Sequence, residues 1–301
     1  MNIIGRKNWY FGLSLLFLIP GIIAIFLWGL NLSIDFTGGS RLTLSFDTIV
    51  NSSEVQLVGE VLKAGKIKVA SIEKSNKSIF IRTSPMDQSQ NNKFVSILSE
   101  KFKDVKEQEF ETIGPVIGQE TTWNALKAVG IASILIIFYI TWSFRQVPKP
   151  ASSFKFGICA IIALIHDVLI VVGSFAIFGH FLGVEVDSLF VTAILTIIGF
   201  SVHDTIVVFD RIRENLKKMG GADFSKTFNE SIMQTIDRSL NTSLTVFLVL
   251  VALLLFGGES IRWFVVALLI GITVGTYSSI FIASPLLVVW EAWDRKRIKI
   301  K

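Results

Sequence analysis

One aspartate and one arginine in this chain occupy places where a charged side chain is costly. Asp204 lies inside the apolar segment LFVTAILTIIGFSVHDTIVVFD at 189–210, and Arg238 stands just before the apolar run that starts at Leu240. A charge at the centre of a bilayer costs about 2.5–3.5 kcal/mol on insertion scales, so such a residue is usually paired or conducts ions or protons. A carboxylate can bind a proton, whereas a guanidinium keeps its own. We therefore predict a buried proton site in which Arg238 pairs with Asp204.

Other polar residues share helix faces with this pair. Ser201 precedes Asp204 by three residues, so the two lie on one face of a helix. The residues that follow Arg238 at spacings of three, four and seven form a polar stripe with it. The competing interpretation is that Arg238 reaches the membrane headgroups with its long side chain. The polar residues expected to support the site are Ser201, His203, Asn241, Thr245, His166 and Asp167.

The two His-Asp pairs, His166-Asp167 and His203-Asp204, allow other interpretations. A metal site would need both members of a pair to face inward, but neighbouring side chains point about 100° apart on a helix. The chain also has no HExxH motif and no Cys pair. An intramembrane aspartyl protease would need Asp167 and Asp204 to share a proton, which a nearby arginine would oppose. We expect no metal, no cofactor, no ATP-binding loop and no enzymatic activity.

Composition indicates a membrane protein that holds these residues in apolar spans. The chain has 301 residues, of which 51% are hydrophobic and only 18% charged. Runs of about 20 apolar residues cross a hydrocarbon core. The first run is too long for a signal-peptide core and has no cleavage site after it, so we expect a retained helix. The six predicted spans are 9–30, 125–144, 156–178, 189–209, 240–256 and 264–290.

The cations predict how the chain crosses the membrane. They gather at the N-terminus, between spans two and three, between spans four and five, and in the basic tail 291–301, whereas 180–187 and 257–262 hold few. By the positive-inside rule, we expect both termini to be cytoplasmic and the loop 31–124 to lie on the far side of the membrane. The net charge of +5 follows the membrane and does not indicate nucleic acid. The single cysteine, Cys159, excludes a disulfide within the chain.

The loop 31–124 is predicted to be a domain of its own. Its pattern is strand 41–46, helix 53–65, strand 69–74, strand 78–83, helix 90–102 and strand 105–112. This βαββαβ order is that of a ferredoxin-like sandwich. Ser52 and Ser53 are candidate caps of the first helix. The fold class is therefore a polytopic α-helical membrane protein with six transmembrane helices, 125–290 holding five of them, and a ferredoxin-like α+β extracytoplasmic domain.

Two further patterns concern the spans themselves. The segment 221–237 has apolar residues at helical spacing and predicts an amphipathic helix at the membrane interface that leads into span five. Gly271 and Gly275 make a pair of small residues one turn apart, which favours close contact between membrane helices.

Five segments resemble, in order along the chain, the signature segments of the SecF family of bacterial protein translocase subunits. They are IDFTGG at 34–39, GPVIGQE at 114–120, ALIHDV at 163–168, GFSVHDTIVVFDRIREN at 199–215 and SIMQTIDRSLNTSLT at 231–245. The resemblance implies membership of the resistance–nodulation–division superfamily and a place in the bacterial inner membrane. It implies pairing with SecD, a sister subunit with six more spans, beside the SecYEG channel. It also implies that Asp204, Arg238 and Thr242 conduct protons. One departure is that many relatives have asparagine where this chain has His203, and imidazole is the side chain that changes charge near neutral pH.

We therefore expect a SecF-like subunit that uses the proton gradient to assist preprotein export. The alternatives are a half-size exporter of a lipid or small molecule, which would need an apolar pocket in the loop domain, and a structural scaffold, in which Asp204 would be dispensable. The membrane potential supplies about 2.3 kcal/mol per charge per 100 mV, enough to bias a two-state equilibrium. The motif residues expected to anchor the loop domain to its two spans are Asp35, Gly38, Gly39, Gly114, Pro115, Gly118 and Glu120.

Overall fold

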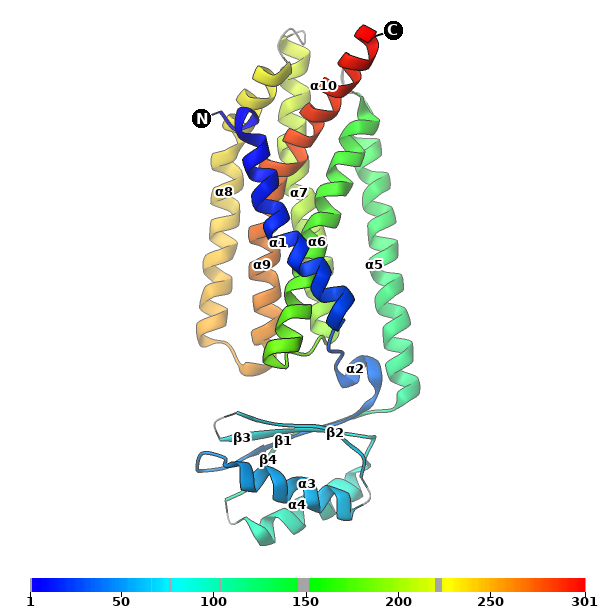
Figure 1. The fold of residues 1–301 in the computed structure, drawn as a ribbon, viewed down its shortest axis with the longest axis vertical. Helices are drawn as coiled ribbons and strands as arrows, with labels where there is room; N and C mark the ends of the chain where they lie inside the picture. The colour runs from blue at the N-terminus through cyan, green and yellow to red at the C-terminus, as the bar shows by residue number, and fades with distance from the viewer. Residues whose placement is uncertain are drawn as a thin grey trace. The chain divides into compact units, whose positions relative to one another are not determined.

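The chain forms two compact units in the computed structural model, which describes residues 2–65, 67–75, 77–102, 104–145, 152–219 and 224–300. One unit is helical and combines Met1–Asn31 with Lys127–Lys301, and the other covers Leu32–Leu126 (Figure 1). The predicted loop residues 146–151, the residues 220–223 and the side chains of the basic tail from residue 295 onward lie outside what the structure describes.

The helical unit contains the six predicted spans, and the helix of the second span begins within the smaller unit before Lys127. The helices long and apolar enough to cross a membrane are Ile4–Trp28, Pro115–Ser143, Ser153–Leu182, Ser188–Lys218, Phe224–Phe256 and Glu259–Asp294. Their elements are η1 (Ile4–Arg6), α1 (Lys7–Trp28), α5 (Pro115–Ser143), α6 (Ser153–Leu182), α7 (Ser188–Met219), α8 (Phe224–Phe256), η2 (Glu259–Ile261), α9 (Arg262–Ser278), the π-helical η3 (Ser279–Ala283) and α10 (Ser284–Ile300). The prediction of six spans is confirmed, and the sixth is interrupted by the π-helical segment η3.

Helices α6, α7 and α9 form the buried centre of this unit, while α1, α5 and α8 are largely exposed. Small residues allow the close approaches. A Cβ atom on Gly21 of α1 would lie 3.2 Å from Cα of Gly173 on α6. On α9, Gly275 faces Ser201 and Gly271 faces Ile197, and both of these partners lie on α7. The predicted role of Gly271 and Gly275 in close helix contact is confirmed.

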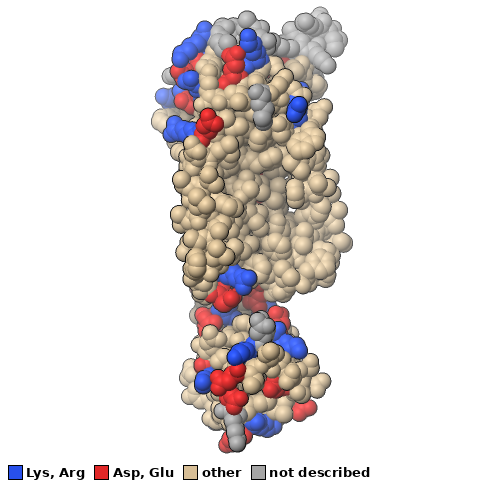
Figure 2. Space-filling model, turned by 90° about the vertical axis from the view of Figure 1, so that its left-hand side faces the viewer, with Lys and Arg blue, Asp and Glu red and all other residues tan. Residues whose placement is uncertain are grey.

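Charged side chains avoid the middle of the helical unit on the face that Figure 2 shows. They gather at the end of this unit where Figure 1 places both chain termini. Several form surface ion pairs within α7, such as Arg213 with Asp210 and Lys218 with Glu214 at 2.6 Å. An uncharged belt between charged ends is the pattern of a protein that crosses a bilayer.

The segment predicted as an interfacial helix that leads into span five is the beginning of α8, which runs from Phe224 to Phe256 without a break. No glycine or proline occurs in this stretch, so nothing ends the helix before the span. Its apolar residues Phe224, Phe228 and Ile232 are buried within the protein. Asn229 on the same helix accepts a hydrogen bond from the amide of Ile3 at 2.8 Å. These first turns therefore pack on protein.

The smaller unit is a four-stranded antiparallel sheet with both long helices on one face (Figure 1). Its elements are α2 (Ile34–Thr37), β1 (Gly39–Ser45), α3 (Ser52–Ala64), β2 (Val69–Ser75), β3 (Ser78–Thr83), α4 (Gln88–Lys101) and β4 (Lys106–Ile113). The strand order is β2-β3-β1-β4, with every neighbouring pair antiparallel. This is the ferredoxin-like arrangement, so the predicted fold class is confirmed.

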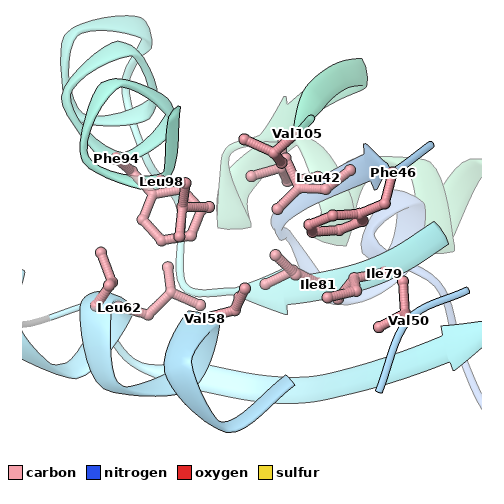
Figure 3. Close-up of a cluster of buried hydrophobic side chains, with 12 residues drawn as sticks. Leu42, Phe46, Val50, Val58, Leu62, Ile79, Ile81, Phe94, Leu98 and Val105 are labelled. Atoms are coloured by element: carbon pink, nitrogen blue, oxygen red, sulfur yellow. The ribbon is translucent and has the colours of Figure 1, made fainter. Parts of the chain in front are cut away.

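The core of this unit lies between the sheet and the helices (Figure 3). Alternate residues of the central strands, including Leu42 and Ile81, meet Leu62 of α3 and Leu98 of α4. Alternation on a strand places these side chains on one face, as the sequence pattern requires. The cap of α3 differs from the prediction: Asn51 is the N-cap residue, and its amide donates to the Glu54 carboxylate at 2.6 Å.

Candidate functional site

Asp204 is buried at the middle of α7, with only 2% of its surface exposed. Three hydroxyls face its carboxylate, from Thr276 of α9 and from Ser239 and Ser243 of α8. The Ser243 and Thr276 hydroxyls also bond to each other. Among the described residues, neither Oδ2 of Asp204 nor Oγ of Ser239 has a hydrogen-bond partner. The carboxylate therefore has a free acceptor oxygen in a site walled by three helices.

A buried carboxylate with a free oxygen suits proton binding. An ionised group away from water is costly unless it is paired, and a bound proton removes the charge. Serine and threonine hydroxyls can rotate and serve either as donors or as acceptors. The hydroxyls around Asp204 can therefore accept from the protonated carboxyl and donate to the ionised one. The hydroxyls at this site can thus form hydrogen bonds with Asp204 in both its protonated and its ionised state.

Arg238 does not lie in this site. The helix α8 turns Ser239 and Ser243 inward, so Arg238, one residue earlier, is exposed on the outer surface of the helix. Consecutive residues of a helix point about 100° apart. Within the described part of the chain no ion pair joins Arg238 to Asp204. The predicted pair is thus not formed within this chain alone.

The remaining stripe residues also face outward. Asn241, Thr242 and Thr245 are exposed. The hydroxyl of Thr242 donates to the carbonyl of Arg238 at 2.9 Å, and that of Thr245 donates to the carbonyl of Thr242 at 2.7 Å. His203 is exposed as well, although its neighbour Asp204 on α7 is buried. The spacing of polar residues therefore predicted a real polar face of α8, but this face is exposed. The buried face of the helix carries Ser239 and Ser243.

A second polar cluster surrounds Asp167, which is fully buried on α6. Its Oδ1 lies 2.9 Å from Nδ1 of His166, and its Oδ2 accepts from Ser201 at 2.6 Å and from Ser278 at 2.7 Å. The other ring nitrogen of His166 bonds to Ser14 of α1. The expectation that neighbouring residues would not both face inward is wrong here. Because α6 contacts α1, α7 and α9, protein covers it on more than one side.

The glycine motifs meet inside the smaller unit. Gly38 has a φ of +69° and Gly39 a φ of +130°, both in the region that favours glycine. A Cβ atom on Gly38 would lie 2.8 Å from Cα of Pro115, and one on Gly118 would lie 2.8 Å from the Gly38 nitrogen. The segment after span one therefore packs against the segment before span two, backbone to backbone.

The other motif residues take no part in that close contact. The amide of Asp35 donates to the Ser33 hydroxyl at 3.2 Å, which caps the short helix α2. A Cβ atom on Gly114 would meet nothing within 4 Å. Glu120 is exposed on the first turns of α5.

Comparison with known proteins places the chain in a family. Residues 93–293 match "Protein export membrane protein SecD/SecF, C-terminal", and residues 23–48, which include Gly38 and Gly39, match the "SecD/SecF GG Motif". The chain is 45% identical to the protein translocase subunit SecF of Thermobaculum terrenum, over 99% of this chain and 96% of that one. The SecF of Anaerolinea thermophila is 44% identical over 98% and 95% of the two chains. This chain belongs to the SecF family of protein translocase subunits.

Some relatives of this SecF chain are much longer. The SecDF of Bacillus subtilis is 37% identical over 98% of this chain, which covers 38% of that protein. The crystal structure of SecDF from Thermus thermophilus, described as a translocon-associated membrane protein, has a TM-score of 0.84 and 34% identity. It matches 97% of this chain, and this chain covers 39% of it. This chain is thus a multi-pass membrane protein of a protein export family.

Proposed function

We propose that this SecF subunit conducts protons through Asp204 and uses their movement to assist preprotein export. The observation that carries the proposal is the Asp204 carboxylate, which is buried at the middle of α7 with Oδ2 unpartnered and three hydroxyls around it. A permanent charge without a cation partner is costly at this depth, so a group that binds and releases a proton accounts for the residue best.

Protonation supplies the force for a conformational change. Each charge that crosses the membrane potential releases about 2.3 kcal/mol per 100 mV. An equilibrium between two helix packings that differ by a few kcal/mol would respond to that amount. The walls of the site are α7, α8 and α9, so these helices are the ones that repack when the carboxylate gains or loses its charge.

The outer face of α8 supports SecD as the partner. The side chains of Arg238 and Asn241 are exposed there, and neither makes a hydrogen bond or ion pair to another described residue. Hydrocarbon offers them no hydrogen-bond partner, so a second membrane protein with polar groups would cover them better than lipid. SecDF relatives contain well over half their length beyond the part that matches this chain. In the assembled complex, SecD would complete the proton path at Arg238 and Thr242.

The cation distribution supports the orientation. Arg211, Arg213, Lys217 and Lys218 lie at one end of α7, and the chain termini lie at the same end of the helical unit (Figure 1). The loops at the opposite end, 180–187 and 257–262, hold few cations. By the positive-inside rule the termini are cytoplasmic, and the smaller unit works outside the membrane on the emerging preprotein, beside SecYEG.

A reconstitution experiment tests this proposal. SecF, SecD and SecYEG are placed in vesicles, and proton flux and preprotein translocation are measured together under an imposed gradient. Asp204→Asn keeps the shape of the protonated carboxyl but does not titrate. The matched control is Asp210→Asn, which changes an exposed aspartate of the same helix whose partner is Arg213.

We expect Asp204→Asn to abolish the gradient-dependent part of both signals and Asp210→Asn to leave both near the wild-type rate. Wild-type translocation in Asp204→Asn would overturn the proton site and favour a scaffold role. Flux that depends on an added lipid and not on preprotein would favour an exporter.

A further inference from the structure

Asp167 is a second carboxylate at mid-helix that the proposed function does not use. It lies on α6, with 0% of its surface exposed. Unlike Asp204, it has both oxygens occupied, by His166 on one side and by Ser201 and Ser278 on the other. Polar groups are disfavoured inside apolar spans, yet three helices each place a polar partner against this carboxylate. The cluster is therefore a specific polar site.

The groups around Asp167 include one other titratable side chain in direct contact, His166. From α1 the cluster receives Ser14, from α7 Ser201 and from α9 Ser278. Among the described residues, no Lys or Arg forms an ion pair with Asp167. The basic side chain in contact with it is His166. The nearest charged cluster on α6 is Lys155 with Glu291 and Asp294 of α10. Lys155 stands twelve residues earlier on α6, about 18 Å along the helix.

We infer that His166 and Asp167 together bind one exchangeable proton and form a second proton site beside Asp204. The proton lies between Nδ1 of His166 and Oδ1 of Asp167, 2.9 Å apart. With the proton the pair is neutral, and without it the pair carries one negative charge. Imidazole is the side chain that most readily exchanges a proton near neutral pH.

The geometry connects this pair to Asp204 through two shared helices. Ser201, which donates to Asp167, stands three residues before Asp204 on α7. On α9, Thr276 faces Asp204 and Ser278 donates to Asp167. Gly275 allows the close approach, since a Cβ atom there would lie 3.1 Å from Cβ of Ser201 and 3.7 Å from Oδ2 of Asp167. The two carboxylates therefore have their polar neighbours on the same stretches of α7 and α9, and a change of charge at one acts on helices that both share.

The π-helical segment marks the same place. It begins at Ser279, directly after Ser278, and runs to Ala283. Such segments interrupt regular helix geometry and occur frequently at functional sites. Here the segment separates α9 from α10, and α9 carries one hydroxyl partner for each carboxylate, Thr276 for Asp204 and Ser278 for Asp167. The second site thus lies where the sixth span is least regular.

This inference deepens the proposed function, but proton binding by the pair can be measured without export. Infrared difference spectra of the full chain together with SecD, with isotope-labelled aspartate, are recorded in lipid vesicles from about pH 4 to about pH 10. The variants are Asp167→Asn, Asp204→Asn and His166→Gln, with Asp210→Asn as the exposed control.

We expect Asp167→Asn to remove one pH-dependent carboxyl signal that remains in Asp204→Asn and in the control. His166→Gln should shift the midpoint of that signal by about one pH unit or more, because glutamine cannot carry the proton. If Asp167→Asn does not assemble, Ser278→Ala serves in its place and should shift the same midpoint. The inference is overturned if the Asp167 signal does not change with pH, or if neither His166→Gln nor Ser278→Ala moves it.

The outcome is separable from that of the proposed function. Loss of a signal in Asp167→Asn but not in Asp204→Asn would support the second site and contradict proton binding at Asp204. The reverse result would leave Asp204 as the proton site and remove the second one.

Discussion

Pro115 and Gly38 touch backbone to backbone, since a Cβ atom on Gly38 would lie 2.8 Å from Cα of Pro115. These residues are 77 positions apart in the sequence, and they belong to the segments that connect the smaller unit to the first and second spans. The contact fixes the two connections relative to each other. A motion of one connection would thus reach the other, at both ends of the smaller unit.

Gly38→Ala is expected to destabilise this junction. The backbone of Gly38, with φ +69° and ψ 167°, is strained for a residue with a side chain by about 1–3 kcal/mol, and the added methyl group would also press on Pro115. Limited proteolysis and preprotein translocation by the full complex should both show the defect. Gly114→Ala is the control, because a Cβ atom there meets nothing within 4 Å. Equal behaviour of the two variants would contradict the importance of the contact.

Leu98→Ala is expected to destabilise the smaller unit by about 2–5 kcal/mol, because Leu98 is fully buried in its core. The measurement is urea unfolding of the isolated unit, residues 32–126, which we expect to fold alone since it has its own sheet and core. The neighbouring Ile97 is 44% exposed, so Ile97→Ala should have a much smaller effect. A larger loss in Ile97→Ala would show that α4 packs through its other face.

The stability of the smaller unit should fall in acid partly through Asp87. Hydrogen bonds from the amide of Gln90 and the hydroxyl of Ser89 hold the pKa of this carboxyl below its usual range. The unfolded chain therefore binds the proton first, and the stabilisation is complete above the ordinary pKa and is lost as pH falls through the lowered one.

Urea unfolding at a series of pH values, for the wild type and Asp87→Asn, measures this contribution. The stability difference between the two proteins should shrink toward acid. A difference that stays constant with pH would assign the effect of the variant to the shape of the cap.

Arg238→Lys should reduce proton flux in the complex with SecD while leaving SecF alone as stable as before. The side chain is exposed in the single chain, so its removal costs little there. In the complex, loss of a bidentate charged contact is worth about 1.5–3 kcal/mol, which corresponds to a roughly ten- to hundredfold change in rate. The control is Arg262→Lys, which changes an exposed arginine at the first residue of α9. Wild-type flux in Arg238→Lys would support contact with lipid headgroups instead.

The sequence was sufficient to predict the spans and the small domain. Long apolar runs and strand alternation are local patterns, and each of them depends on few neighbours. Asp204 could also be singled out, because a charge in an apolar run is conspicuous without any knowledge of packing.

The side chains around Asp204 were harder to predict. Periodicity defined a polar face on α8 at Arg238, but the buried face carries Ser239 and Ser243, whose small hydroxyls resemble ordinary helix residues in a sequence. Which face turns inward is decided by the packing of α8 against α7 and α9, through contacts distant along the chain. The spacing of Ser239 and Ser243, four residues apart, was the signal that could have pointed to them.

The even number of spans has a consequence for how such proteins are encoded. A unit with six crossings returns both of its ends to one face, as Figure 1 shows for the helical unit. A second six-span unit can then be joined to it by a short linker that never enters the bilayer. Fusion or separation of the two genes leaves the orientation of every helix unchanged. The SecDF of Bacillus subtilis holds such a unit within a longer polypeptide, since 98% of this chain matches 38% of that protein.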